Sequence, residues 1–402
     1  MKETVFFNEL KKLNFGFHKP RKDDCNTCTK YRETKVKTPE IEQAHEEHLI
    51  RAKMARQLRD TDKAISKEDP TYLTVICDLE AVSHCPRAPA SNFFYKSKIN
   101  CYNFTIIDLA TMKGYCYRWD QTIGLRGADE MTSARLHFYS HMMDKNVTEV
   151  VEYSDTCGGQ NRSKFLSTSL CNFLQGSNVK KFTQKFFESG HSQSEVDTMH
   201  SSLEKRLKDK CIYRPEQWLE ATREAGSVSG QKYEVFALGS TATPILDTRS
   251  LVTDVVKNVE VAIDLETGDE VKSAWMKAHR IVYGSGNGDD FTIKLHNSFS
   301  TDECGRTIDL LEKPTKGKNL RSSQPAMRQS VPQVLNVLVD SKSPKLPINV
   351  DIVKGLLELC KGKKDGSGGV IPDEYHSYYN SLNKTPDTIL DVEYADVDDT
   401  GT

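Results

Sequence analysis

The fold is decided by the stretch Tyr153-Ser154-Asp155-Thr156-Cys157-Gly158-Gly159-Gln160-Asn161-Arg162. It starts at the end of a short apolar run, passes through an acidic residue, and continues into glycines and polar residues of the kind that open a helix. A carboxylate at such a strand end is a hard oxygen ligand for a divalent cation. The stretch therefore predicts an α/β arrangement with a metal-binding aspartate, Asp155.

Two other aspartates have matching settings. Asp78 closes the apolar run Tyr72-Leu73-Thr74-Val75-Ile76-Cys77, and Asp197 lies in the first turn of a predicted helix. In an α/β sheet, functional groups gather at the carboxyl ends of strands, and neighbouring strands lie about 5 Å apart. We therefore expect Asp78 and Asp155 on adjacent strands to bind Mg²⁺ or Mn²⁺ together with Asp197.

The composition is that of a globular protein. The chain has 402 residues, of which 37% are hydrophobic and 28% charged, so two or three domains are possible and fibrous and membrane classes are excluded. No apolar run approaches the roughly 18 residues of a spanning helix, and the amino terminus has no secretory signal. The eleven cysteines are an odd number, which favours thiols in a reducing compartment. We expect an intracellular protein.

The net charge of −2 gives no general electrostatic case for nucleic-acid binding, because strong binders usually carry a basic face. Local basic patches flank Asp197 instead. They comprise Lys180, Lys181 and Lys185 on one side, and Lys205, Arg206, Lys208 and Lys210 on the other. Solvated helix and strand faces are the alternative interpretation of both patches.

The periodicity from residue 71 predicts three strands, a helix, a strand, a helix, a strand and a final helix. The strands fall at 72–77, 101–109, 114–119, 149–153 and 181–187, and the helices start near 128, 162 and 194. A mixed five-stranded sheet with flanking helices accounts for this order.

Composition divides the chain into six parts. They are a helical arm with a Cys-x-x-Cys pair (1–70), the α/β core (71–226), a smaller β-rich accessory domain (231–312), a linker (313–345), a short helical segment (346–385) and an acidic, disordered tail (386–402).

The segments Ser154 to Asn161 and Gly190-His191-Ser192 to Val196-Asp197 resemble the signatures of a eukaryotic family of largely uncharacterised, mobile-element-related proteins. That family is similar to DDE-type transposases with a ribonuclease H-like core. Its members tend to carry a Cys-x-x-Cys segment ahead of the core, here Cys25 and Cys28. The resemblance covers about residues 25–226 and implies a ribonuclease H-like α/β fold.

The resemblance also implies an acidic triad of Asp78, Asp155 and Asp197. The residues that it places around the triad or against substrate are Glu80, Gly158, Gly159, Gln160, Asn161 and His191. Many such enzymes end the triad with glutamate, so Glu195 and Glu204 are alternatives for the third ligand. We favour Asp197, because Glu204 lies about two helical turns, roughly 10 Å, beyond it.

Each aspartate also has a purely structural interpretation. Asp78 suits a strand end or turn, Asp155 can cap the following helix, and Asp197 is favoured near the positive end of its helix. The joint pattern favours the metal site over these separate roles.

The arm contains a second candidate metal site. Cys25 and Cys28, followed by His45 and His48 one turn apart on a predicted helix, supply four ligands for tetrahedral zinc. His18 is an alternative to one of the histidines. A polar arm offers little core in which the two thiols would otherwise be buried, which favours structural Zn²⁺.

The leading hypothesis is a metal-dependent DNA nuclease or strand transferase, transposase-derived and located in the nucleus, in which water or a 3′-hydroxyl attacks a phosphodiester. A domesticated, catalytically inactive protein that binds nucleic acid or protein is the alternative. A third hypothesis is an intracellular scaffold that docks another protein through residues 231–312 and the carboxyl-terminal helices, with the aspartates in structural roles. The expected partner is nucleic acid, above all DNA, with a homo-oligomer as a further option and no membrane.

Overall fold

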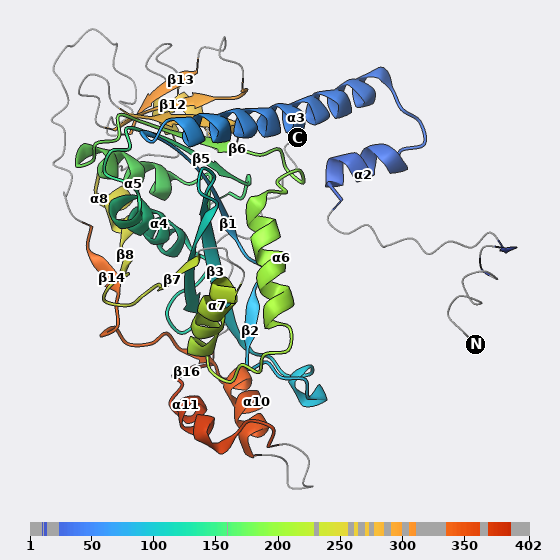
Figure 1. Ribbon diagram of the computed structural model, residues 1–402, viewed down its shortest axis with the longest axis vertical. Helices are drawn as coiled ribbons and strands as arrows, with labels where there is room; N and C mark the ends of the chain where they lie inside the picture. Colours follow the sequence, from blue (N-terminus) through green and yellow to red (C-terminus); the bar gives the residue numbers. More distant parts are fainter. Residues whose placement is uncertain are drawn as a thin grey trace.

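A mixed ten-stranded sheet forms the centre of the protein (Figure 1). The computed structural model describes residues 10, 12–13, 24–158, 160–228, 233–255, 261–263, 270–272, 277–284, 291–299, 305–310, 335–361 and 369–386. Within these ranges, no helix combines the length and the apolar character that crossing a membrane requires. None of the ten cysteines in these ranges forms a disulfide.

Five strands make up the middle of the sheet. They are β1 (Tyr72–Leu79), β3 (Ile99–Asp108), β4 (Lys113–Asp120), β5 (Glu149–Ser154) and β6 (Lys181–Phe186). Their order across the sheet is β4-β3-β1-β5-β6. The β1–β3 and β3–β4 pairs are antiparallel, whereas β1–β5 and β5–β6 are parallel. The α/β class predicted from periodicity is therefore confirmed, and these five strands fall where the pattern indicates.

The sheet is wider than the five strands expected. Strand β7 (Tyr233–Ala237) pairs with β4 at one edge, and β11 (Arg280–Tyr283) pairs with β6 towards the other, followed by β12 (Thr292–His296) and β13 (Arg306–Asp309). Four of the described strands of 231–312, β7, β11, β12 and β13, thus extend the core sheet. The edges of β4 and β6 would otherwise expose unpaired backbone N–H and C=O groups, which these additional strands satisfy.

Helices cover both faces of the sheet. One face carries α4 (Ala128–His137), α5 (Lys164–Gln175) and α8 (Thr248–Val255), and the other carries α6 (Glu195–Leu207) and α7 (Glu216–Val228) (Figure 1). The helices are amphipathic, so each buries one apolar stripe. In α6 the buried apolar residues are Val196, Met199, Leu203 and Leu207, which pack with the α7 side chains Trp218 and Ala221.

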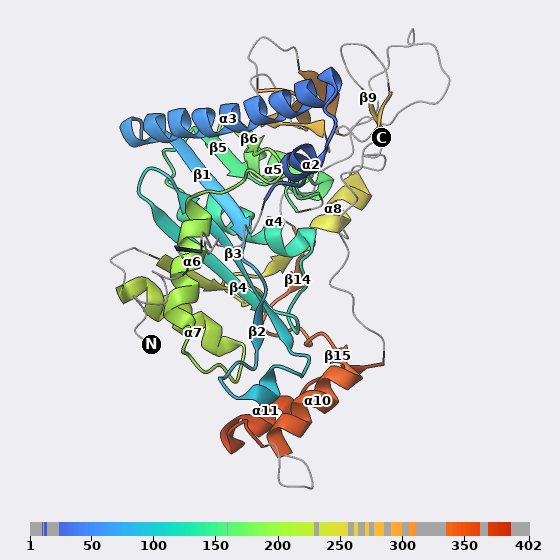
Figure 2. The ribbon, with the colours of Figure 1, turned by 90° about the vertical axis from the view of Figure 1, so that its right-hand side faces the viewer.

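The long helix α3 (Pro39–Glu68) belongs to the core, although residues 1–70 were expected to form a polar arm. Thr38 caps its first turn, with Pro39 at the start, as is common at helix N-termini. Figures 1 and 2 show α3 crossing over β1, β5 and β6. Its buried Asp62 accepts hydrogen bonds from Tyr72 Oη of β1 at 2.9 Å and from Lys185 Nζ of β6 at 2.6 Å. The shorter helix α2 (Asn26–Glu33) precedes α3.

The carboxyl-terminal part contains two short helices, as periodicity indicates. They are α10 (Val350–Lys361) and α11 (His376–Asn380), whose Leu356 and Tyr379 are fully buried. Residues 313–334 of the predicted linker lie outside the described residues. Its remaining part, 335–345, contains β14 (Val337–Val339). The acidic tail is outside them from residue 387.

The other short elements complete the chain. They are β2 (Ser83–Cys85), β8 (Ile245–Leu246), β9 (Val261–Ile263), β10 (Glu270–Lys272), β15 (Ile348–Asn349) and β16 (Lys384–Thr385), the 3₁₀ turns Ser91–Phe93 and Asp373–Tyr375, and a π turn at Phe138–Met142. Strand β2 pairs with β3, and β8 pairs with β14.

Candidate metal sites

Asp78 and Asp155 lie at the same level of adjacent parallel strands. In the β1–β5 register, Ile76 lies opposite Tyr153, and the two aspartates follow two residues later on each chain. Because side chains alternate along a strand, each aspartate faces the same side of the sheet as the residue two before it. Ile76 and Tyr153 pack in the cluster that includes Val196 of α6. Both aspartates therefore face the side of the sheet on which α6 carries Asp197 in its first turn.

The three carboxylates interact electrostatically. Burial raises the pKa of Asp78 to about 8, and the negative charges of Asp155 and Asp197 contribute to that rise. Like charges disfavour ionisation of a neighbouring carboxyl group. The structure therefore brings together three acidic side chains that are distant in sequence, in an arrangement whose charge repulsion a divalent cation would relieve.

The three carboxylates do not form a compact ligand group in the described residues. Among the described residues, the only group of three or more Cys, His, Asp or Glu side chains with all ligand atoms within 4.8 Å of one another is a Cys/His group. Asp155 Oδ1 accepts a hydrogen bond from the backbone N–H of Cys157 at 3.0 Å. Asp197 Oδ2 accepts one from the backbone N–H of Ser194 at 2.7 Å and caps α6. Asp197 is thus part of a capping box at the positive end of α6, where the helix dipole was expected to favour it.

The alternative acidic ligands are placed elsewhere. Glu80, expected beside the triad, is buried and paired with Arg118 at 3.2 Å. Glu195 forms an ion pair with Lys63 of α3 at 2.8 Å. Glu204 is exposed on α6. Of the three α6 candidates, Asp197 is the one whose charge contributes to the raised pKa of Asp78.

The glycine-containing loop after β5 holds Asp155 in place. Asn161 is buried, and its Nδ2 donates a hydrogen bond to Asp155 Oδ1 at 2.5 Å, while its Oδ1 accepts one from Arg135. Arg135 in turn pairs with the buried Glu152 of β5. Sequence reasoning missed Arg135 and Glu152. Charged residues within an apolar strand and on the buried stripe of a helix are the signal that could have identified them.

The remaining loop residues have simpler positions. Gly158 forms a β-bridge with Arg162, and Gln160 is half-buried. Gly159 lies outside the described residues. Asn161 therefore provides the link from this loop to the triad, through its side-chain hydrogen bond to Asp155.

The basic patches expected beside Asp197 are partly neutralised. Lys181 pairs with Glu149 at 2.5 Å, Lys185 is buried against Asp62, and Lys210 pairs with Glu224 at 2.7 Å. Exposed pairs of this kind are weak and leave the local net charge low. The local electrostatic case for nucleic-acid binding is therefore smaller than the sequence alone indicates.

The raised pKa of Asp78 makes a prediction about stability. Between about pH 4 and pH 8 the folded chain keeps a proton on Asp78 that the unfolded chain releases, so the contribution of this group to stability falls as pH rises. Asp78→Asn should remove that slope and raise the free energy of unfolding at pH 8, relative to pH 5, by roughly 3–4 kcal/mol. Urea denaturation at both pH values without added divalent cation measures the effect. An unchanged slope would contradict the assignment.

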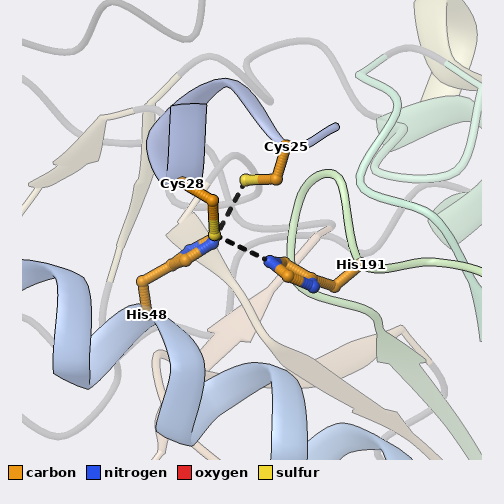
Figure 3. Close-up of side chains that lie close together, drawn as sticks. All are labelled: Cys25, Cys28, His48 and His191. Carbon is orange, nitrogen blue, oxygen red and sulfur yellow. Dashed lines mark hydrogen bonds between the residues drawn. The ribbon is translucent and has the colours of Figure 1, made fainter. Parts of the chain in front are cut away.

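The second candidate site joins segments that lie far apart in sequence. Cys25 and Cys28 come from the start of α2, His48 from α3, and His191 from the loop between β6 and α6 (Figure 3). Cys25 Sγ lies 3.2 Å from His48 Nε2, and Cys28 Sγ lies 3.4 Å from His191 Nε2. One ligand atom from each of the four residues falls within 4.8 Å of all the others, so the group could hold a metal ion.

The surroundings of this Cys/His centre suit a metal. His48 Nδ1 lies 2.7 Å from Glu188 Oε1, which directs Nε2 towards the thiols, and metal-binding histidines usually have such a carboxylate partner. Burial lowers the pKa of His191, as does the nearby His48, which favours the neutral imidazole that binds metals. Burial raises the pKa of Cys28, and so does the adjacent Cys25. A bound cation would offset that cost of ionising the thiols.

The ligand set expected from sequence was wrong at one position. His45 stacks on Tyr31 with ring centroids 3.8 Å apart and does not join the group, whereas His191 does. His45 stacks on Tyr31 of α2 and is therefore not available to the thiols. The loop between β6 and α6 passes close to Cys25 and Cys28 and brings His191 to them instead. His191 had been expected near the carboxylates. His18 lies outside the described residues.

Comparisons of the chain with protein-family models, with curated proteins and with solved structures find no match. The interpretation of both sites therefore depends on their geometry and chemistry.

Proposed function

We propose that the protein is a metal-dependent DNA nuclease or strand transferase with a ribonuclease H-like core, related to DDE-type transposases and acting in the nucleus. One observation carries the proposal: the charges of Asp155 and Asp197 act on the partly buried Asp78. The strand order β4-β3-β1-β5-β6, with β3 antiparallel to β1, supports a ribonuclease H-like core. Residues on two neighbouring strands and one helix thus supply oxygen ligands at one edge of the sheet.

The donor set fits Mg²⁺ or Mn²⁺, because both prefer carboxylate oxygens. Bound there, such ions would act as Lewis acids on the phosphate and lower the pKa of a nucleophilic water or hydroxyl.

Other residues of the chain fix this geometry. Asn161 holds one Asp155 oxygen, and the buried Arg135 holds Asn161. His200 of α6 lies 3.0 Å from Thr105 Oγ1, and Thr105 lies opposite Asp78 in the β1–β3 register. The helix that carries Asp197 is therefore tied by a hydrogen bond to the strand beside Asp78. Rigid positioning of this kind is what catalysis by metal-bound oxygens requires.

A catalytically inactive protein that binds nucleic acid or protein partners is the second candidate. The capping bond from Ser194 to Asp197 favours it, since a carboxylate used to cap a helix has a sufficient structural reason to be present.

Crystals soaked in Mn²⁺ separate the two candidates. The catalytic proposal expects anomalous peaks between Asp78, Asp155 and Asp197, and Mg²⁺-dependent cleavage of labelled DNA. Labelled RNA of the same sequence would test the choice of DNA. A structure with the carboxylates ordered and no peak between them would contradict catalysis and leave the binding role.

We also assign the Cys/His centre to structural zinc. Two thiolates and two imidazoles form the ligand set that Zn²⁺ prefers in closed structural sites. The purified chain should contain one zinc ion per molecule by mass spectrometry or atomic absorption. Cys28→Ser should remove it, whereas His45→Ala, which changes a neighbouring histidine outside the group, should retain it. Equal zinc contents in both variants would contradict the assignment.

A further inference from the structure

We infer that the Cys/His centre fixes the loop and helix start that carry Asp197, so that zinc in this centre controls divalent-cation binding at the three aspartates. The inference rests on the proposed function of the carboxylates. His191 is then a positioning residue, because it acts on the acidic site only through the segment between His191 and Asp197. The contacts that carry it run along one continuous segment, residues 188 to 197.

The loop between β6 and α6 is attached to the amino-terminal helices at consecutive residues. Glu188 accepts hydrogen bonds from Arg51 Nε at 3.0 Å and faces His48 Nδ1. The next residue, Ser189, accepts a hydrogen bond through its carbonyl oxygen from Cys25 Sγ at 3.5 Å. His191 then faces Cys28. Residues 187–194 include no strand or helix, so these contacts hold the loop together with the backbone hydrogen bonds from Phe187 to Ser154 and from His191 to Glu188.

Gly190 allows the close approach of the two segments. Its φ of 71° lies in the left-handed region that side chains disfavour. A Cβ built at this position would lie 2.7 Å from Cys25 Cβ and 2.8 Å from Cys25 Cα. A backbone this close to Cys25 leaves room only for glycine, so the loop and the Cys-x-x-Cys segment fit as a pair.

The start of α6 is held from its other side as well. Glu195 pairs with Lys63 at 2.8 Å and with Arg59 at 3.3 Å, both from α3. Ser194 and Asp197 cap α6 together. They therefore lie next to two attachments of their segment to the amino-terminal helices, one through His191 and one through Glu195. Asp197 reaches Asp78 only if this segment keeps its path.

Zinc is the strongest of these attachments. Exposed or partly exposed ion pairs contribute little to the stability of the folded form, whereas binding of structural zinc contributes a large share of it. Without the metal, the two thiols and two imidazoles hold the loop through weak sulfur–nitrogen contacts, Cys25 to His48 and Cys28 to His191. Without zinc, Asp197 should therefore leave its position beside Asp78 more often than Asp155 does. The sheet and its adjoining loop fix Asp78 and Asp155 independently of the Cys/His centre.

The test compares Mn²⁺ binding by the zinc-loaded full chain with binding by His191→Ala, using electron paramagnetic resonance. The Asp155→Asn variant defines the signal that belongs to the carboxylates. We expect at least a tenfold weaker Mn²⁺ affinity in His191→Ala, and faster hydrogen exchange of the amides of residues 194–198. His45→Ala is the matched control and should retain zinc, Mn²⁺ affinity and exchange rates.

The two failures can be distinguished. Unchanged Mn²⁺ affinity and exchange rates in a chain that has lost zinc would overturn the inference. No specific Mn²⁺ binding by the zinc-loaded chain would overturn the proposed function, while the exchange measurement would still decide whether zinc fixes the start of α6. If circular dichroism shows that His191→Ala does not fold, the wild-type chain stripped of zinc by chelation and dialysis provides the same two measurements.

Discussion

Asp155→Asn is expected to reduce Mg²⁺-dependent cleavage of labelled DNA by about three orders of magnitude, since electrostatic stabilisation of the transition state is usually the largest catalytic contribution. The substitution keeps the shape of the side chain and removes the negative charge that interacts with Asp78. The amide would retain a partner in Asn161, so the fold should persist. Initial rates under substrate excess measure the effect.

Glu204→Gln is the matched control for this change. It also converts a carboxylate into an amide, on the exposed face of α6, and removes the glutamate that many transposases would use as third ligand. Cleavage should stay within about twofold of the wild-type rate, because exposed groups away from a site contribute little. A large loss in Glu204→Gln together with full activity in Asp155→Asn would mean that the acidic site is wrongly assigned.

Arg135→Ala is expected to destabilise the chain by about 3–5 kcal/mol, because it leaves a buried carboxylate without its cation. Arg135 and Glu152 are both fully buried, and Arg135 Nε lies 3.1 Å from each carboxylate oxygen. Glu152 would keep hydrogen bonds from Tyr139 and Gln184 but no positive charge. Urea denaturation followed by circular dichroism gives the free energy of unfolding.

The exposed pair Lys181–Glu149 provides the comparison, since Glu149 belongs to the same strand as Glu152. Lys181→Ala removes a cation from a pair in which the lysine side chain is 53% exposed, so the loss should stay below about 1 kcal/mol. Similar losses in the two variants would show that burial does not determine the strength of these ion pairs.

The central strands and helices could be predicted because each is defined by a pattern among residues that are close together in sequence. The five central strands and the helices between them follow from apolar periodicity, since each element buries one stripe or face. The strands beyond residue 230 could be recognised individually from the sequence, but not the fact that β7, β11, β12 and β13 join the central sheet. Strand β7 pairs with β4, and β11 pairs with β6. The pairing uses backbone N–H and C=O groups, so the side-chain pattern of a strand does not indicate which edge strand it joins.

The acidic site and the Cys/His centre differ in the same way. Asp78 and Asp155 stood out in the sequence because each comes at the end of an apolar run, whereas only the packing of α6 on the sheet brings Asp197 to the same side. Cys25, Cys28 and His48 lie within a short segment that suggests metal binding by its spacing. His191 lies more than a hundred residues later, where spacing carries no information about a shared site.

The amino-acid sequence by itself determined the α/β class and the order of the central elements, because hydrophobic periodicity is a local property of the chain, and it led to the proposal of the three aspartates from their strand-end and helix-start positions. Only the tertiary structure decided that the sheet has ten strands, that His191 replaces His45 beside the thiols, and that Glu80 and Glu195 are used in ion pairs. These outcomes depend on which distant segments pack together, and that choice is made by the free energy of the whole fold.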